Sequence, residues 1–444
     1  MKECLRKASL GLFIIIMSST ISVANGFSIY GHGARALALA NAFVARACDP
    51  SAMWFNPAGI AQLAGTHVYL GGSGFSHNQR FSSDRTQGTY TSENGFLLSP
   101  NIYFTQQLSR RMWLGIGFHA TADFYQNWGD APTDENPVPQ HLSHIRTHTH
   151  TLSPAVVVKL NESFSLGLGV HYAISALRVR KWDADGIAEL LQERTGLTTS
   201  RVELSSETEG SGSALSTFAG LNWRITPMIR FGLAYHHAAD LNYAAKMDFS
   251  LPTIGNSVLD ADLEAIFPDQ DINGSFQNWV DQFSLGLSLC LGTKLNLEGD
   301  LVFNFWSQLA PWEFTDISPL TILGMTRNPG TSLELDWSWV DTMSLRLGGE
   351  YHASKCLDIR LGVSYDPSPI PTDSLKILAP LSNRIGIGMG LGYKINNLSI
   401  DLGYMLFFAS EKKETSSSQY FYDMHLHAAT GNVLSLSAGW MFQK

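Results

Sequence analysis

The chain has 444 residues and a net charge of -9, with 30 basic and 39 acidic side chains. This acidic balance argues against a nucleic-acid partner, and a mean hydropathy of -0.02 excludes a bundle of membrane helices. Once Cys4 leaves with the N-terminal leader described below, Cys48, Cys290 and Cys356 remain. Their odd number, without a CxxC pair, favours neither a disulfide framework nor a zinc or redox site. We therefore expect no cofactor, no metal and no catalytic residue.

Residues 1–24 have the pattern of a secretory signal peptide. Basic residues precede the apolar run Leu10–Met17, and small residues follow it up to Ala24 and Gly26. The run is shorter than the roughly 20 residues that a membrane helix needs. The pattern predicts cleavage after Ala24 or Gly26; the alternative is an N-terminal anchor helix.

The segment 25–65 lacks the alternation of a strand. Ala34–Ala47 is rich in alanine and leucine, which predicts a short helix. Asp49-Pro50 and Asn56-Pro57 each place a capping residue before a proline at the first helical position. We expect a small, partly helical piece ahead of the strands.

From residue 66 onward, apolar and polar residues alternate in short segments. In 293–306, Leu297 and Leu301 share one face, whereas Glu298 and Asp300 share the other, as strand geometry requires. A soluble protein would bury the apolar face, but a membrane barrel turns it to lipid and the charged face to the lumen. About fourteen such segments start near residues 66, 95, 111, 146, 163, 212, 228, 280, 293, 338, 357, 382, 397 and 431.

The connections between these segments alternate between short and long. The short ones are Ser109-Arg110-Arg111, Asn161-Glu162, Thr226-Pro227, Gly292-Thr293, Ser354-Lys355 and Asn396-Asn397. The long, polar ones span 78–95, 125–146, 182–210, 241–279, 309–336, 367–380 and 410–430. This sorting is typical of an outer-membrane barrel, with short periplasmic turns and long extracellular loops. The sequence therefore predicts an all-β fold, a transmembrane antiparallel β-barrel of about fourteen strands over 66–444. Segment 25–65 is then a plug in a lumen that would otherwise be an open pore.

Three short motifs stand out in the mature chain. Phe27 follows the signal peptide, Asn56-Pro57-Ala58 lies in the expected plug, and Tyr365-Asp366-Pro367-Ser368-Pro369-Ile370-Pro371 follows a late strand. With these motifs the chain resembles the outer-membrane long-chain fatty acid transporters (FadL/TodX-like, OMPP1) over essentially its whole mature length.

The resemblance implies a fourteen-stranded barrel with an N-terminal hatch, a channel rather than an enzyme. Such channels admit long-chain fatty acids or aromatic hydrocarbons across the bacterial outer membrane without an energy source. Ligand binds a loop groove, then a deeper pocket near the hatch, and leaves sideways into the bilayer at a kinked third strand. Carried over residue by residue, Phe27 would contact the deep ligand, Asn56, Pro57 and Ala58 would shape the hatch, and Gly115 and Gly117 are candidates for the kink.

Two of the long loops carry apolar residues at helical spacing. These are Leu259, Leu263, Ile266 and Phe267 in one loop, and Ile187, Leu190 and Leu191 in the other. We interpret both sets as walls of a groove that binds ligand first. The alternative is that they pack each loop onto its neighbour.

A carboxylate ligand would favour a nearby cation. Arg178 and Arg180 end the fifth segment and are candidates, but the parity of Arg178 turns it toward lipid, where a charge is costly. Either the strand has left the membrane at that height or a bulge re-aims the side chain. Lumen parity favours Arg346, Arg360 and Arg384, whose alternative role is to line the wall in ion pairs with Glu350 or Asp358.

Histidines 144, 148 and 150 share one face of a strand. Their spacing can suit a metal, but we interpret them as ordinary polar residues lining the lumen.

The hypothesis from the sequence is passive uptake of long-chain fatty acids by a monomeric barrel surrounded by outer-membrane lipid and lipopolysaccharide. A second hypothesis keeps the fold and changes the cargo to aromatic hydrocarbons. A lipase and an adhesive barrel that binds a host surface are hypotheses from other classes.

Overall fold

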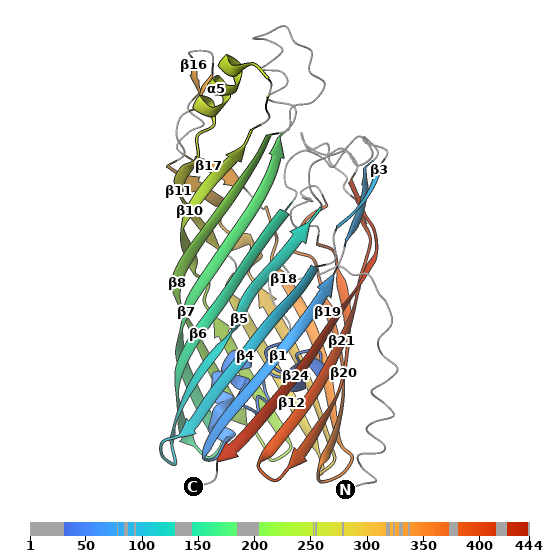
Figure 1. Ribbon diagram of the computed structural model, residues 1–444. Helices are drawn as coiled ribbons and strands as arrows, with labels where there is room; N and C mark the ends of the chain where they lie inside the picture. The colour runs from blue at the N-terminus through green and yellow to red at the C-terminus, as the bar shows by residue number, and fades with distance from the viewer. Residues whose placement is uncertain are drawn as a thin grey trace.

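The computed structural model is a closed antiparallel β-barrel (Figure 1). It describes residues 31–77, 79–83, 88–92, 95–128, 144–183, 204–251, 253, 255–277, 279–316, 320–322, 325–327, 332–335, 338–372, 381–413 and 424–442. The predicted signal peptide, Phe27, and the loop residues Ile187, Leu190 and Leu191 lie outside this part of the chain. Among the described residues, no helix is long and apolar enough to cross a membrane.

In the described part of the chain, fourteen antiparallel strands form the barrel. Ten are continuous: β1 (Thr66–His77), β4 (Gly95–Gln107), β5 (Met112–Asn127), β6 (His144–Asn161), β7 (Phe164–Asp183), β8 (Leu204–Arg224), β19 (Leu357–Asp366), β20 (Arg384–Ile395), β21 (Leu398–Ala409) and β24 (Ala429–Phe442). Four are broken into a lower and an upper piece: β9 (Ile229–His236) with β10 (Asp240–Ser250), β12 (Gln282–Leu291) with β11 (Gln270–Gln277), β13 (Leu295–Asn304) with β14 (Trp312–Thr315), and β18 (Thr342–His352) with β17 (Ser332–Leu335). The ring closes because β1 pairs with both β4 and β24.

The predicted strands and short turns are confirmed, whereas two of the predicted long loops are wrong in part because they contain further strands. Each predicted segment matches one barrel strand, and two to four residues make each turn at the lower end of Figure 1. The stretches 241–279 and 309–336, however, contain the upper strands β10, β11, β14 and β17. These strands carry the barrel wall beyond the predicted length. Their inward residues are apolar and buried, such as Leu241, Tyr243 and Phe314, whereas Asn242 and Lys246 point outward.

Several short strands and helices lie outside the main barrel sheet, mostly toward its upper end. They are β2 (Arg80–Ser83), β3 (Gly88–Thr91), β22 (Lys412–Lys413) and β23 (Met424–Leu426) in one sheet, the hairpin of β15 (Leu320–Ile322) and β16 (Met325–Arg327), η2 (Trp306–Gln308) and α5 (Ser257–Ile266). The helix predicted around Leu263 is therefore confirmed as α5, at the tip of the β10–β11 hairpin (Figure 1).

The two faces of the wall have the predicted polarity. Leu361 and Val363 of β19 point outward and are 61% and 50% exposed, whereas Asp358 and Arg360 of the same strand are buried inside. An apolar exterior with a charged interior is the arrangement of a membrane barrel. Trp113, near the lower end of β5, points inward and donates from its indole to the carbonyl of Leu63 at 2.7 Å.

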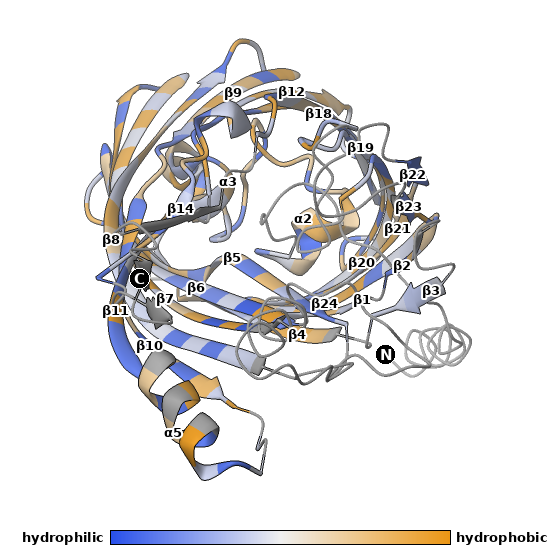
Figure 2. Cartoon of the chain, turned by 90° about the horizontal axis from the view of Figure 1, so that it is seen from above, coloured by the Kyte–Doolittle hydropathy of each residue, from blue (hydrophilic) through white to orange (hydrophobic). Residues whose placement is uncertain are grey.

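Residues 31–65, called the inner segment below, lie inside the barrel. They form α2 (Ala34–Ala38), α3 (Ala52–Phe55) and η1 (Pro57–Gln62), and Figure 2 shows α2 and α3 within the ring of strands. The helix expected over Ala34–Ala47 stops early, because Ala40 and Asn41 adopt positive φ angles of 52° and 61° and turn the chain back. A left-handed pair ends an α-helix.

Glycines that pair across neighbouring strands form the part of the inner wall that the inner segment contacts. Gly167 of β7 pairs with Gly220 of β8, and a Cβ on Gly167 would lie 2.8 Å from the backbone nitrogen of Ala58. Gly232 and Gly286 pair in the same way beneath the backbone of Val44 and Ala45, and Gly348, Gly362 and Gly388 do so beneath Leu37–Ala40. A side chain at any of these positions would collide with the inner segment, so only glycine lets the segment lie this close to the wall.

Candidate functional site

The ladder between β4 and β5 is incomplete. Among the described residues these two strands pair only from Asn101↔His119 down to Gln107↔Trp113. Above that point β4 remains paired with β1, and β5 remains paired with β6. We call Gly95–Pro100 of β4 and Ala120–Asn127 of β5, which face each other without ladder pairing, the seam.

A β-bulge begins the seam. The register of β5 against β6 shifts between Ala120 and Ala122, so Thr121 is an extra residue. Inward-facing positions change from odd numbers, ending at His119, to even numbers, starting at Ala122. Across from it, Pro100 has no backbone N–H with which to continue a ladder. A bulge of this kind bends a strand and ends pairing.

The structure places the irregularity of the third barrel strand away from the predicted kink. Gly115 and Gly117 lie in the regular ladder, opposite Ala155 and Ser153 of β6. Their lack of a side chain serves close contacts instead, because a Cβ on Gly117 would lie 3.0 Å from the ring of Tyr103. The irregularity at Thr121 lies four to six residues after Gly117 and Gly115. The prediction of a kink at these two glycines was therefore wrong.

The β4 side of the seam carries apolar residues on its outer face. Phe96 and Leu98 of β4 point outward and are 68% and 65% exposed. On the β5 side, Asp123 faces outward and pairs with His148 at 2.6 Å. The seam is therefore apolar toward the membrane on its β4 side and polar on its β5 side.

A hydrogen-bonded chain of buried histidines lines the inner side of the seam. His119 Nε2 lies 3.1 Å from Ser153 Oγ, and Ser153 Oγ lies 2.8 Å from His171 Nδ1. His171 Nε2 in turn lies 3.1 Å from His236 Nδ1. The three imidazoles come from β5, β7 and β9, and all are nearly without solvent exposure. Together with His32 of the inner segment they form what we call the imidazole cluster.

Trp54 of the inner segment covers this cluster. Its ring is stacked on His32 at 4.1 Å between centroids and lies 4.6 Å from His236 and 5.1 Å from His119. On the other side, Phe218 is stacked on His171 at 4.1 Å. The cluster is thus an uncharged, aromatic surface between the inner segment and the seam.

The opposite side of the inner segment is held by charge. Glu350 of β18 receives Arg35 in a fork of 2.8 and 3.0 Å, Arg46, and Arg360 at 2.6 Å. Glu350 is completely buried. Its carboxylate therefore joins two arginines of the inner segment to one arginine of the wall, in the bidentate geometry that guanidinium groups favour.

Two further carboxylates bind the backbone of the inner segment. Asp300 Oδ2 accepts from the N–H groups of Phe43 and Val44 at 2.7 and 3.0 Å. Glu298 accepts from the N–H groups of Ala45 and Arg46 at 2.8 and 3.0 Å. We call these two carboxylates together with Glu350 the carboxylate anchor.

The ligand atoms of Glu350, His352 and Asp358 lie within 4.8 Å of one another, close enough for a shared cation. Their oxygens are already in ion pairs, however, including Arg360 on Glu350 and Lys394 on Asp358 at 2.9 Å. Cationic side chains thus hold the positions that a metal would need, so this group belongs to the anchor network.

The predicted hatch triplet, Asn56-Pro57-Ala58, lies at the start of η1 and against β8. Asn56 donates from its amide to the carbonyls of Val44 and Leu221, both at 2.9 Å, and its oxygen caps Ala58 N at 3.1 Å. Pro57 is the first residue of η1. Asn56 therefore joins three pieces of chain, including the wall strand β8.

The arginines of the interior are where parity predicted them. Arg346, Arg360 and Arg384 are all buried, and Arg360 and Arg384 pair with wall carboxylates, Arg384 with Asp366 at 3.7 Å. Their role as wall residues in ion pairs is therefore the one that the structure favours.

Arg178 and Arg180 do not reach the lumen site. Arg178 lies on the outer face and is paired with Glu207 and Glu209, and Arg180 also pairs with Glu207. The β7–β8 ladder runs from Phe164 to Asp183 without a shift, so no bulge re-aims Arg178. A strand of 20 residues is about twice the 9–11 needed to cross a membrane, so Arg178 lies on the part beyond it.

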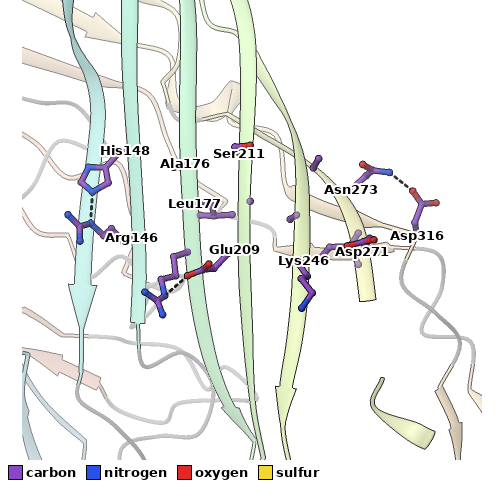
Figure 3. Close-up of a pocket in the computed structure, with 15 residues that line it drawn as sticks. Arg146, His148, Ala176, Leu177, Glu209, Ser211, Lys246, Asp271, Asn273 and Asp316 are labelled. Carbon is purple, nitrogen blue, oxygen red and sulfur yellow. Dashed lines mark hydrogen bonds and ion pairs between the residues drawn. The ribbon is translucent and has the colours of Figure 1, made fainter. Parts of the chain in front are cut away.

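The outer surface around Arg178 carries a row of charges across five strands. Arg146, Arg178, Glu209, Lys246 and Asp271 are successive register partners. They rim a shallow depression of about 900 Å³ (Figure 3). His144 and His148 lie on this same outer face of β6, whereas Thr147 and Thr149 point inward and are buried. The interpretation of these histidines as lumen-lining was therefore wrong.

The predicted capture residues lie around α5. Leu263 is buried, and Phe267 packs against Phe249 at 5.6 Å between ring centroids. The backbone of Leu259 lies in the same helix. The contacts of Leu263 and Phe267 are those of a loop packed on itself.

The fold and the site define a class before any comparison. A closed barrel with an apolar exterior, charged side chains buried inside and a folded segment in its lumen is an outer-membrane barrel protein.

Comparison with known proteins then gives the family. Residues 15–442 match the family described as outer membrane protein transport protein (OMPP1/FadL/TodX). The chain belongs to this family of outer-membrane transport proteins for hydrophobic compounds, which are channels and not enzymes.

The sequence is also similar to individual members. It is 21% identical over 359 residues to the long-chain fatty acid transport protein of Escherichia coli O6:H1, covering 77% of this chain and 75% of that one. Among solved structures, a Pseudomonas aeruginosa FadL homologue superimposes with a TM-score of 0.78 at 18% identity, over 94% of this chain and 100% of the other. The Ralstonia pickettii toluene transporter TbuX does so with 0.65 at 18% identity, over 93% and 99%. These two structural likenesses show the fold.

Proposed function

We propose that the protein admits long-chain fatty acids across the outer membrane by diffusion, with lateral release into the bilayer through the seam. The inner segment acts as the hatch, shaped by Asn56, Pro57 and Ala58. Phe27, outside the described residues, contacts the ligand near it. The single observation that carries the proposal is the seam, which combines an ended ladder with an apolar exterior at Phe96 and Leu98.

A lateral route fits the chemistry of such a cargo. Each CH₂ of an acyl tail costs roughly 0.8 kcal/mol to expose to water, so a path that ends in water at the periplasmic side would hold the tail back. A path that ends in hydrocarbon avoids this cost. The bulge at Thr121 supports such an exit, because it ends pairing between two strands without opening the rest of the ring.

The carboxylate anchor supports a hatch that stays inside the barrel. Removing the inner segment would break the ion pairs of Glu350 with Arg35 and Arg46 and the backbone hydrogen bonds that Glu298 and Asp300 accept, at about 0.5–3 kcal/mol for each bond. A hatch that adjusts locally on the side of the imidazole cluster does not incur this cost.

First capture is assigned to the extracellular loops around α5. Val258 on this helix is 68% exposed and offers an apolar contact. In this proposal Leu263 and Phe267 pack within the loop, and the helix that also contains Leu259 presents its exposed face to the ligand.

The barrel works as a monomer within this proposal. The ring is closed through β1, so outside the seam the described barrel strands are paired on both sides and offer no free edge to another copy. Its exterior is surrounded by outer-membrane lipid and, at the height of Arg178, by lipopolysaccharide.

The test is uptake by a bacterial strain that lacks its own transporter and expresses this chain, with an empty vector as control. Labelled oleate and labelled toluene are supplied separately, and the surface level of the folded barrel is measured by its heat-modifiable migration. Oleate uptake above the vector, with toluene at the vector level, is the expected result. Toluene uptake without oleate uptake would transfer the proposal to aromatic hydrocarbons. Uptake of neither by a surface-located barrel would contradict transport of both classes and favour an adhesive role.

A further inference from the structure

The six short turns at the lower end of the barrel are basic (Figure 1). Five cationic side chains lie in these turns or at the strand ends beside them, and all five are exposed. They are Arg110, Arg111, Arg224, Lys294 and Lys355. We call these five side chains the basic rim. Among the described residues of this end, the lysines that form ion pairs are others, Lys159 and Lys394.

Few carboxylates lie near the basic rim. Among the described residues of the six turns, Glu162 is the only acidic one, and it pairs with Lys159 at 2.6 Å. Asp358, near the start of β19, is buried and pairs with Lys394 at 2.9 Å. The chain as a whole has a net charge of -9, so the charge of the rim is opposite in sign to that of the molecule.

The outer surface at the upper end has cations of a different kind. Arg178 is paired with Glu207 and Glu209, and Lys246 is paired with Asp248 at 2.5 Å. Basic and acidic side chains there neutralise each other. The basic rim therefore differs from the upper surface in having positive charge without nearby carboxylates to balance it.

Apolar side chains accompany the cations of the rim. Within three positions of a rim residue, four large apolar side chains are exposed, namely Leu108, Met112, Ile225 and Leu291. A surface for a soluble acidic partner has no need of them. Long basic side chains beside apolar ones suit the edge of a membrane, where the apolar groups enter hydrocarbon and the charges extend to the head groups.

The rim also lies at the depth of a membrane surface. The apolar outer face of β7 begins close to its turn, since Leu166 is exposed and lies three residues after Ser163. Three residues of a strand span about 10 Å. Because the short turns of outer-membrane barrels face the periplasm, the basic rim is next to the lipid head groups of the leaflet on the periplasmic side.

We propose that the basic rim binds the phosphate groups of anionic phospholipids in the leaflet on the periplasmic side. Arginine and lysine form charge-assisted hydrogen bonds with phosphate, and an anionic leaflet attracts basic side chains that lie within a Debye length of its surface. The five cations come from four different turns, so the rim holds several lipids around the barrel. The inference goes beyond the proposed function, because it concerns the surrounding membrane and not the cargo.

The experiment measures which lipid lies against the lower end of the barrel. Trp223, beside Arg224, and Trp440, near the end of β24, are exposed and serve as reporters. The purified barrel is reconstituted into mixed bilayers of phosphatidylcholine and phosphatidylglycerol, in which one lipid or the other carries brominated acyl chains. Quenching of tryptophan fluorescence gives the relative affinity for the two lipids.

Two variants with the same change in net charge are compared. The rim variant is Arg110→Gln/Arg111→Gln/Arg224→Gln/Lys294→Gln. The matched control removes four cations from the upper outer surface, as Arg146→Gln/Arg178→Gln/Arg180→Gln/Lys246→Gln. All these side chains lie at the surface, and heat-modifiable gel migration measures the folded fraction of each variant.

The parent should bind phosphatidylglycerol about fivefold or more tighter than phosphatidylcholine at low salt, and the preference should weaken at high salt because salt screens the charges. The rim variant should bind the two lipids about equally, and the control should keep the parent preference. Equal affinities in the parent, or an equal loss in both variants, would overturn the proposal. A parent preference that the rim variant keeps would also overturn it and favour a soluble acidic partner for these cations.

Discussion

The inner segment is held by two sides of the barrel in opposite ways. Toward β13 and β18 it meets the carboxylate anchor, where Glu350, Glu298 and Asp300 bind two guanidinium groups and four backbone N–H groups. Toward β5, β7 and β9 it meets the imidazole cluster, with aromatic stacking and hydrogen bonds between uncharged groups.

The difference suggests that one side of the inner segment keeps it in the barrel, whereas the other side can move. Breaking a buried ion pair leaves a charge without a partner, which costs far more than rotating an aromatic ring off its neighbour. The seam lies on the uncharged side. A segment fixed by charge on one side and stacked on the other can therefore move on the side of the seam and still remain in the lumen.

The largest effect is expected from removing the centre of the anchor. Glu350→Ala leaves Arg35, Arg46 and Arg360 without their shared carboxylate, and loss of one partner of a buried pair costs about 3–5 kcal/mol. The barrel should unfold in detergent at a clearly lower temperature and should admit hydrophilic antibiotics. Heat-modifiable gel migration and antibiotic sensitivity measure these two effects.

Glu209→Ala is the matched control for this variant, because Glu209 pairs with Arg178 on the outer surface and is 59% exposed. An exposed pair contributes only about 0–1 kcal/mol. Equal behaviour of the two variants would contradict the anchor.

A smaller effect is expected where the uncharged side meets the wall. Asn56→Ala leaves the carbonyls of Val44 and Leu221 and the N–H of Ala58 without their partner, at about 1–3 kcal/mol for a buried group left unpaired. Hydrogen exchange should become faster in η1 and stay slow at Phe43 and Val44, whose N–H groups Asp300 holds. Faster exchange over the whole inner segment would show that the two sides are not independent.

The seam is tested by deleting Thr121. The residue is the extra one of the bulge, so its loss leaves His119, Ala120 and Ala122 on their present faces while straightening β5. Pairing with β4 should then extend upward and close the seam. Oleate uptake should fall about tenfold, which corresponds to about 1.4 kcal/mol, with no loss of thermal stability.

Thr121→Ala is the control for the deletion, since it keeps the extra residue and should transport like the parent. Parent-level uptake by the deletion variant would remove the seam as the exit.

Local pattern was enough to predict the wall and insufficient to predict the site. The strands follow from alternation at each segment, such as Leu297 against Glu298, because side-chain direction in a strand is a property of neighbouring residues. The inward glycines were visible as a row, Gly386 to Gly392, but their meaning required knowing what lies against them.

The imidazole cluster depends on registers that no single segment reveals. His119, His171 and His236 are distant in sequence and meet only because β5, β7 and β9 align at one height. The bulge was hidden as well, since Ala120, Thr121 and Ala122 are all small and give no sign of a change of face. The sequence offered one sign of the cluster and of the bulge, namely a histidine at an inward position among small residues. By alternation alone, such a histidine is predicted to be an ordinary polar residue of the lumen wall.

Parity placed the charge of Arg178 on the lipid side of its strand, and the length of the strand explains this by carrying the residue beyond the membrane. The smallest predicted effect is for a substitution of this arginine. The side chain faces outward beyond the membrane, 47% exposed and paired with Glu207 and Glu209. Arg178→Ala should therefore change stability by no more than about 1 kcal/mol and leave oleate uptake at the parent value. Labelled oleate uptake at equal surface level measures this, and a clear loss of uptake in this variant would give the charged outer surface around Arg178 a part in transport.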